Sequence, residues 1–545
     1  MSSSLINIGM QGVRASQAGL AVTSNNISNI NSEGYSRQTV TQYSSATYGV
    51  TTSSVSRIAD QYAVKNLQTQ TSVYQESSAK LQLSQVLDEL ISGSTNSISD
   101  SISSFFASVN DAISDPSDTT SRSLVLSNAQ ELSGVFNQVN DTLLSQQSDI
   151  NDTITSSVTS INSLTTSLAD LNSQISSAYN QGQSVPDLED QRDEVIRQLS
   201  EQVGVYTADA ENGMVNVYLN GGDALVAGVT STNLNVVQGE YDKNQLDISI
   251  GNSTTSISSK ISGGSLGGAI EYRDEILNPT INQVGQLAMT FSESVNSVLE
   301  QGVDLNGDAG QALFDPALSG SYTVSNRVLA SSNNDGSASG TLTFPTGWDP
   351  STLTSSDYAV RYDSGTGEYT ITRSSDGSEV ASGAGPDFTV DGFDLSFSGT
   401  PSDGDSFLIR PTYSFAGELS TTDITSKELA FAASGSTTDV SGDNSNGQLL
   451  ADLQNSSIVD GSLSFEGAYS QIIGDVGGYA SKASMAEESN ATLLSSAQDI
   501  RDSVSAVSED EEAANLIKFQ QAYQAAAQVI SAAQQTFSTL LSAIS

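Results

Sequence analysis

The chain has 545 residues, enough for several domains, and carries 63 acidic against 19 basic residues, a formal charge of −44. This charge argues against binding nucleic acid or anionic lipid, because phosphates would be repelled. Neither Cys nor His occurs, which removes disulfides, thiolate nucleophiles, ordinary zinc sites and histidine general bases. Enzymes are therefore a disfavoured class, and we expect no cofactor and no metal.

Targeting signals are equally sparse. No apolar run reaches the length that spans a bilayer, so we expect no membrane insertion. The first residues lack a basic region followed by a continuous apolar stretch, so no cleaved secretory signal is predicted. The chain should therefore be cytoplasmic, or exported by a route that needs no such signal.

The N-terminal residues predict an amphipathic helix. Small and apolar side chains recur at steps of three and four over residues 3–23, and the small ones would let another helix approach closely. An Asn- and Ser-rich turn follows, and residues 39–52 read as extended and polar. The helix positions that would face a partner are Leu5, Ile8, Gly12, Ala15, Gly19 and Val22.

The residues after this helix carry a family resemblance. Ser24-Asn25-Asn26-Ile27-Ser28-Asn29, continued by Gly34-Tyr35-Ser36-Arg37-Gln38, resembles the N-terminal signature of bacterial flagellar rod, hook and hook-associated proteins. The resemblance implies that the two chain ends pair as helices and line the core of a tubular assembly. It places Asn25, Asn26, Asn29, Gly34 and Tyr35 in the assembly interface.

Residues 58–200 are predicted to be mostly helical. Their apolar stripe is narrow and long, which is typical of bundles or coiled coils rather than compact α/β domains. A further helix opens at Pro186, and we interpret Asp190 and Asp193 as acids that serve its dipole. The longest stripe comprises Leu132, Phe136, Val139, Leu143, Ile150, Ile154, Ile161, Leu164, Leu168, Leu171 and Ile175.

Two β units interrupt the helices. From Val203 the apolar period changes to two, and turn signals predict a small β unit. Helix returns over residues 266–301. Alternating strands then predict a larger antiparallel β domain over 322–411, a sandwich or a partly open barrel, and helix should resume near Thr425.

The C-terminal residues predict a second long amphipathic helix. Acidic residues 509–512 precede it, favourable at the positive end of a helix dipole. Its pattern indicates packing along another helix, either the N-terminal one or a helix of a neighbouring copy, and an ordinary intramolecular bundle is the alternative. The interface positions are Leu516, Phe519, Tyr523, Ala526, Ile530, Ala533, Phe537, Leu540 and Ile544.

The fold class is thus a multidomain α+β protein. An elongated helical bundle or coiled coil is formed by both chain ends and carries two inserted antiparallel β domains. The predicted parts are an N-terminal assembly helix with its extended segment (1–57), a long-helix bundle (58–202, 262–315 and 420–514), a small β unit (203–261), a larger β domain (316–419) and a C-terminal assembly helix (515–545).

The sequence contains only weak signals of ligand sites. Residues 304–315 resemble part of a calcium loop, but Ala309 replaces the required Gly, and the last ligand, Asp315, is not the bidentate Glu. The Gly-rich stretch 263–269 opens a helix, yet no Lys-Ser/Thr follows as a phosphate loop requires. We interpret both as tight turns, and we predict no catalytic residue.

Further motifs narrow the resemblance. They are similar, in order, to stretches of the hook-associated protein 1 family, which joins hook to filament. This implies a non-catalytic protein of the extracellular flagellum, exported through the flagellar type III apparatus. Its partners would be copies of itself, hook protein, a second junction protein, flagellin-type filament subunits and an export chaperone. The motifs are residues 187–193, 264–268, 271–275, 302–307, 404–411, 442–446, 503–507, 511–516 and 519–530.

Three alternatives remain open at this stage. The chain could be another axial protein of the hook, rod or filament. An exported surface adhesin would use the β domain over 322–411 to bind glycan or host protein. A hydrolase of peptidoglycan would have to work with carboxylates, and the sequence shows no carbohydrate cleft for them.

Overall fold

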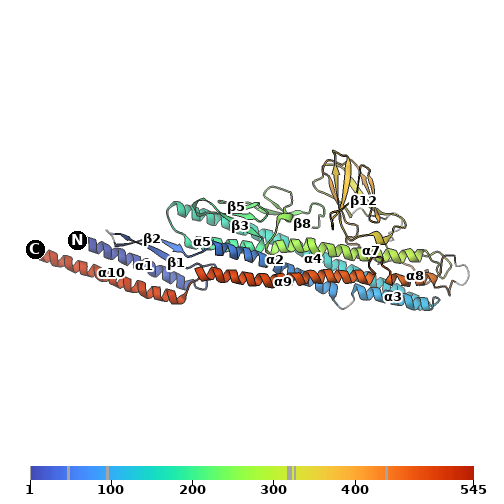
Figure 1. Ribbon diagram of the computed structural model, residues 1–545, viewed down its shortest axis with the longest axis horizontal. Coiled ribbons are helices and arrows are strands. Elements are labelled where there is room, and N and C mark those ends of the chain that lie inside the picture. Colours follow the sequence, from blue (N-terminus) through green and yellow to red (C-terminus); the bar gives the residue numbers. More distant parts are fainter. Residues whose placement is uncertain are drawn as a thin grey trace.

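The computed structural model describes residues 2–45, 49–93, 97–315, 322–324, 327–435 and 440–544. They form an elongated molecule whose two termini lie together at one end (Figure 1). Helices α1 (Ser2–Ser28) and α10 (Glu509–Ile544) form this end together with a hairpin of β1 (Gln38–Ser45) and β2 (Gly49–Arg57), and we call it the arm. The remaining helices form the body. The predicted fold class is confirmed.

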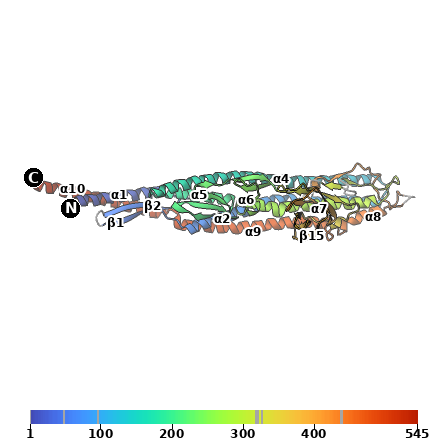
Figure 2. The same ribbon diagram turned by 90° about the horizontal axis from the view of Figure 1, so that it is seen from above.

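Long helices of the body lie along its axis (Figure 2). The side chains of Asp60, Ser97 and Asp118 accept backbone N–H groups in the first turns of α2, α3 and α4, which fixes where these helices begin. The helices are α2 (Gln61–Ser92), α3 (Ile98–Ser114), α4 (Thr119–Asn180), α5 (Pro186–Gln202), α6 (Gly264–Tyr272), α7 (Asn278–Glu300), α8 (Ser445–Asp452) and α9 (Phe465–Ser505), with a π-helical turn, η3 (Arg273–Leu277), between α6 and α7.

The core of the body follows the predicted stripe of α4, which is buried except for the half-buried Leu164. Phe291 on α7 packs against four other rings at the far end. Its centroid lies 5.4 Å from Phe105, 5.9 Å from Phe106, 5.6 Å from Phe314 and 5.1 Å from Phe465. Edge-to-face rings at these distances add about 0.5–1.5 kcal/mol per pair to the gain from burial.

A small β unit lies on α4. Asn172 of α4 donates to the carbonyls of Val215 and Gly228, so a helix side chain satisfies the sheet edge. All pairings are antiparallel, in the orders β3-β4-β5-β6 and β7-β8. The strands are β3 (Val205–Asp209), β4 (Val215–Leu219), β5 (Ala224–Ala227), β6 (Thr230–Ser231), β7 (Leu234–Gln238) and β8 (Leu246–Ile250).

The larger β domain projects from the side of the body (Figure 1). Its strands form two antiparallel sheets, ordered β10-β12-β17-β16 and β11-β18-β13-β14-β15. Phe393, Tyr358 and Phe397 are buried between them, as expected for a sandwich. The strands are β10 (Tyr322–Val324), β11 (Val328–Ala330), β12 (Ser339–Phe344), β13 (Tyr358–Asp363), β14 (Glu368–Arg373), β15 (Glu379–Gly383), β16 (Asp387–Val390), β17 (Phe393–Ser398) and β18 (Ser406–Ile409).

A buried arginine holds this domain against the body. Arg410 lies 3.1 Å from Asp242 of the small β unit and 3.5 Å from Asp357, and its guanidinium covers the Tyr413 ring at 3.3 Å. Tyr413 in turn donates to Gln147 on α4 at 2.9 Å. The two β units and α4 therefore meet at one charged cluster, which fixes the direction in which the domain projects.

The predicted return to helix near Thr425 is wrong, because α8 begins only at Ser445. Leu429 and Phe431 are buried, but they lie in an irregular segment near the N-terminus of α4. Arg122 holds this segment by donating to the carbonyl of Leu429 at 2.6 Å and covering the Phe431 ring at 4.4 Å. The short strands β9 (Phe314–Asp315) and β19 (Ser420–Thr421) pair nearby.

Candidate assembly interface

The two terminal helices run antiparallel along each other in the arm (Figures 1 and 2). Gly9 faces Ile530 and Gly19 faces Phe519, so the pairing covers the middle of α1, from residue 9 to residue 19. A methyl group at Gly19 would lie 2.6 Å from two atoms of the Phe519 ring. Glycine therefore allows this ring to rest directly on the backbone of α1.

The structure places several of the predicted helix positions at this contact, including Gly12 against Ala526 and Gly19 against Phe519. On α1, Ala15 and Gly19 are buried while Leu5 is exposed. On α10, Ala533 is buried, whereas Tyr523 and Phe537 are exposed. Leu540 and Ile544 belong to α10, but their side chains lie outside the described residues. The half-buried positions are Ile8, Gly12, Val22, Leu516, Phe519, Ala526 and Ile530.

The predicted Asn-rich turn joins α1 to the hairpin. Asn26 donates to the carbonyl of Gln38 and accepts its N–H, both at 2.9 Å, and accepts from the Tyr35 hydroxyl at 2.8 Å. Asn29 donates back to the carbonyl of Asn25 at the end of the helix. Gly34 turns the chain with φ +78° beside Glu194. Asn26 is thus the residue through which helix, turn and strand are joined.

Our interpretation of Asp190 and Asp193 as dipole residues misses their main partner. Arg57 at the end of β2 lies 2.9 Å from Asp190 and 2.7 Å from Asp193. Asp190 also accepts the backbone N–H of Ser36 at 2.9 Å. These carboxylates therefore fasten the arm to α5. The sequence reasoning missed Arg57, although its place at the end of an uncharged polar strand was visible.

Burial and charge shift the protonation equilibria here. Burial raises the pKa of Asp190, while Ser36 and Arg57 act in the opposite direction. Burial opposes the charged form of Arg57, but the neighbouring carboxylates raise its pKa, so the guanidinium stays charged. Burial and then the charges of Asp187, Asp190 and Glu512 raise the pKa of Tyr35 to about 12, so its phenol stays protonated and donates to Asn26.

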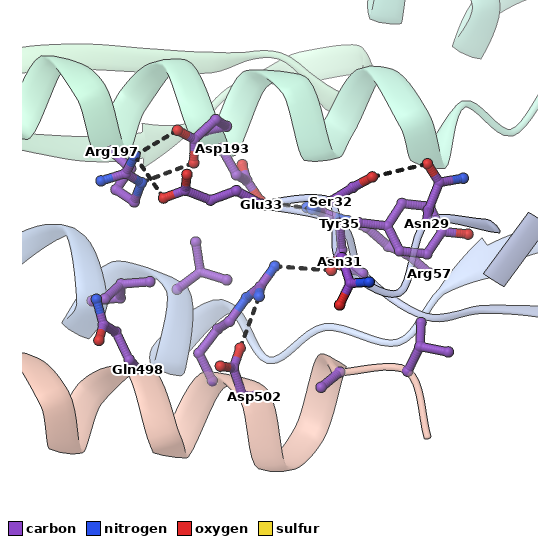
Figure 3. A pocket seen from close by; sticks show the side chains of 18 of the residues that line it. Asn29, Asn31, Ser32, Glu33, Tyr35, Arg57, Asp193, Arg197, Gln498 and Asp502 are labelled. Atoms are coloured by element: carbon purple, nitrogen blue, oxygen red, sulfur yellow. Dashed lines mark hydrogen bonds and ion pairs between the residues drawn. The ribbon is translucent and has the colours of Figure 1, made fainter. Parts of the chain in front are cut away.

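A cavity of about 350 Å³ lies at this joint, between the turn over 29–36, α2, α5 and the end of α9 (Figure 3). Arg501 from α9 donates to the carbonyl of Tyr35 at 3.1 Å and pairs with Asp502 at 2.8 Å. On the opposite wall Arg197 pairs with Glu194 at 2.7 Å. These arginines are neutralised by neighbouring carboxylates, so we interpret the cavity as a polar joint between the arm and the body.

The turn between α9 and α10 is fastened to Arg37, the residue before β1. The N–H of Arg37 donates to the carbonyl of Ser505 at 2.8 Å, at the last residue of α9. The Arg37 side chain pairs with Glu511 in the first turn of α10. One residue of the N-terminal segment thus holds both sides of the turn where the C-terminal segment leaves the body.

The calcium-like loop proves to be a turn. Asp304 is buried, and its carboxylate accepts the N–H groups of Asn306 and Asp308, each at 2.8 Å. Among the described residues, no group of three or more acidic side chains is arranged to hold a metal ion. Over the same residues, no helix is long and apolar enough to cross a membrane.

Comparison with known proteins identifies the family. Residues 83–314 match the profile of the flagellar hook-associated protein FlgK helical domain, residues 329–411 that of the D2-like domain of flagellar hook-associated protein 1, and residues 501–543 that of the flagellar basal body rod FlgEFG protein C-terminal region. The first two profiles cover parts of the body and of the β domain, and the third covers the end of α9 and nearly all of α10.

Whole-chain similarity agrees with these profiles. The chain is 31% identical to flagellar hook-associated protein 1 of Escherichia coli over 558 residues and to that of Salmonella typhimurium over 562, and covers 99% of both chains in each case. The solved structure of the flagellar hook junction protein FlgK from Burkholderia pseudomallei has a TM-score of 0.72 and 24% identity, with 81% of this chain and 100% of that chain covered. The chain therefore belongs to the flagellar hook-associated protein 1 family.

Proposed function

We propose that this chain is a structural, non-catalytic subunit of the flagellar axis that joins hook to filament by self-assembly through its paired terminal helices. The observation that carries the proposal is the arm itself. Its two helices pair through small residues, and large apolar side chains remain on their outer faces.

These outer side chains require a covering partner. Leu5 and Met10 on α1 are 45% and 43% exposed, and Ile517, Val529 and Phe537 on α10 are 56%, 40% and 49% exposed. Burying such side chains fully contributes about 1.5–3 kcal/mol each. A seam of Gly and Ala buries little by itself, so neighbouring subunits would supply much of the stability of the arm.

Membership of the family supports association with other flagellar axial components. We propose copies of this chain as the partners along the arm, with hook protein on one side and a second junction protein and flagellin-type filament subunits on the other. An export chaperone would hold the chain before assembly. The chain would then reach the extracellular flagellum without a cleaved signal peptide.

A deletion strain tests this function. We expect intact hooks, with filament protein shed into the medium, and the wild-type chain should restore attached filaments. The double variant Ile517→Ser/Val529→Ser should be exported and yet fail to restore them. The matched control is Leu449→Ser on α8 of the body, since Leu449 is 54% exposed, and this variant should restore them.

Other outcomes would contradict the proposal. Attached filaments in the deletion strain would remove the junction role. Loss of surface attachment in cells with normal filaments would indicate an adhesin instead. Lysis of cell-wall substrate by the pure chain would indicate a hydrolase.

A further inference from the structure

We propose that the β1–β2 hairpin is a second contact between copies of this chain, formed when the outer edge of one hairpin pairs with the outer edge of the neighbouring copy's hairpin. The proposal rests on the proposed self-assembly and adds a surface that the terminal helices do not include. Its chemistry is backbone hydrogen bonding along an uncharged strand, as in other cases of strand addition.

The distribution of charge points to the arm as the place where copies approach closely. Residues 1–32, 38–56 and 513–545 contain no Asp or Glu and two basic residues, Arg14 and Lys518. The rest of the chain carries 63 acidic against 17 basic residues, a formal charge of −46. Bodies with this charge repel one another, whereas the acid-free segments allow contact between identical copies without repulsion.

The hairpin lies within these acid-free segments. Residues 38–56 contain no charged residue of either sign and no proline. Exposed edge strands of proteins that stay monomeric are commonly guarded by lysine, proline or inward-pointing charges, which prevent pairing with another chain. Residues 38–56 carry no such charge or proline, but the register shifts at a bulge between Thr41 and Gln42. The outer edges on either side of that bulge therefore suit pairing with another strand.

The backbone shows which edge groups are already used. At the base of β1, Asn26 occupies both the N–H and the carbonyl of Gln38. Because backbone groups alternate along a strand, those of Val40 point to the same outer edge. On β2, the carbonyl of Val55, which lies opposite Val40, accepts from Ser184. Across the rest of the hairpin, the described residues provide no further strand for either outer edge.

The hairpin is also too small to be stable by itself. A two-stranded sheet is marginal in water and needs a third strand or a packed face. Here one face rests on α1, where Gln42 reaches the carbonyl of Ala15 at 3.4 Å. This packed face already supports the hairpin, and a neighbouring strand would add hydrogen bonds along its outer edge. Because each hairpin offers two different edges, β1 of one copy and β2 of the next can meet repeatedly around a closed ring.

Cross-linking tests the contact directly. The chain has no Cys, so variants Thr39→Cys in β1 and Ser54→Cys in β2 each carry a single thiol and cannot cross-link within one chain. Both variants would be co-expressed in the deletion strain, and isolated hook–filament complexes treated with a short thiol-to-thiol cross-linker. We expect the amount of cross-linked dimer to be at least tenfold higher in these complexes than in a mixture of the two unassembled variants. Ser54→Cys paired with Ser156→Cys on exposed α4 should give none, and absence of the first dimer would overturn the proposal.

A proline variant distinguishes failure of the strand pairing from failure of the proposed junction role. Val40→Pro removes an outward N–H and leaves the inward bonds of the hairpin in place, as edge strands tolerate. Val40→Ala loses the same side chain but keeps the N–H. We expect Val40→Pro to lower incorporation into the junction at least tenfold relative to Val40→Ala. Equal incorporation would overturn strand addition and leave the junction role standing, whereas a wild-type chain absent from the junction would overturn both.

Discussion

Single residues determine how closely the terminal helices approach each other and how the arm is held to the body. Gly19 admits the Phe519 ring, and Arg57 neutralises carboxylates of α5. The glycine was predicted from its place in a periodic pattern. The arginine was not, because its partners lie more than a hundred residues away and local periodicity carries no information about them.

The variant Gly19→Ala should weaken the arm. Alanine is the better helix former by about 1 kcal/mol, but its methyl group would overlap the Phe519 ring, and overpacking costs about 1–3 kcal/mol. We expect faster cleavage of α1 and α10 in limited proteolysis. Gly134→Ala on α4 is the matched control, since nothing lies within 4 Å of the added methyl. Equal proteolysis of Gly19→Ala and the wild-type chain would show that the ring moves aside freely.

Replacing Arg57 by Met should cost more than replacing a surface cation. Removal of one partner leaves carboxylates in a partly buried cluster without compensation, at a cost of about 3–5 kcal/mol. Lys260→Met removes a pair in which the lysine is 53% exposed, so it should cost about 0–1 kcal/mol. Denaturant unfolding, followed by a probe in the arm, measures the difference. Similar losses of unfolding free energy in the two variants would contradict a structural role for Arg57 at the joint.

The raised pKa of Tyr35 predicts that the joint between arm and body loses stability at high pH. Its pKa is raised to about 12 from the ordinary value of 10, so its stabilising contribution is complete below pH 10 and is lost as the pH rises to about 12. Phenolate absorbance of the wild-type chain minus that of Tyr35→Phe should titrate with a midpoint near 12. A midpoint at the ordinary tyrosine value would mean that Tyr35 is not buried beside these carboxylates in solution.

At the scale of elements, the long helices were predictable and the irregular segments were not. The stripe of α4 repeats over many turns, so period alone identified it. Residues 425–435 contain buried apolar side chains without a regular helix, because Arg122 satisfies carbonyls there in place of a helix ladder. The β domain was recognised from alternation, but its two-sheet order depends on which strands meet in space.

The stability of the contact between the β domain and the body should depend on Arg410. Its side chain is 4% exposed and lies between two carboxylates and the Tyr413 ring. Arg410→Met leaves both acids without their cation, and we expect a loss of about 3–5 kcal/mol in the free energy of unfolding. Arg361→Met on the exposed side of β13 should be close to neutral. An unchanged unfolding free energy in Arg410→Met would show that the other contacts suffice.

At the scale of the whole molecule, most of the acidic charge is separated from the terminal helices and the hairpin. A net −44 on a chain with few basic residues creates repulsion throughout the body. The arm, whose α10 carries acids only in its first turn (Glu509–Glu512), lies at one end, away from the β domain (Figure 1). In the proposed assembly, this separation would let copies meet through segments with little charge.

Stability should therefore rise with ionic strength. The screening length falls from about 30 Å at 0.01 M salt to about 8 Å at 0.15 M, which weakens repulsion between acidic side chains. We expect the thermal midpoint to increase over this range, by similar amounts in NaCl and KCl, because screening depends on ionic strength rather than on the cation. A midpoint independent of salt would contradict charge repulsion as a limit on stability.

The sequence by itself determined the alternation of helices and β units, the antiparallel character of the strands and the two terminal stripes, because these depend on local periods and turn residues. Its motifs also carried the family resemblance. Only the tertiary structure decided which residues hold the arm together, fasten it to the body and join the larger β domain to the small β unit. Those bonds join Arg37 to Glu511, Arg57 to Asp190 and Arg410 to Asp242 across long stretches of chain, and contacts at such separations depend on how the chain folds back in space.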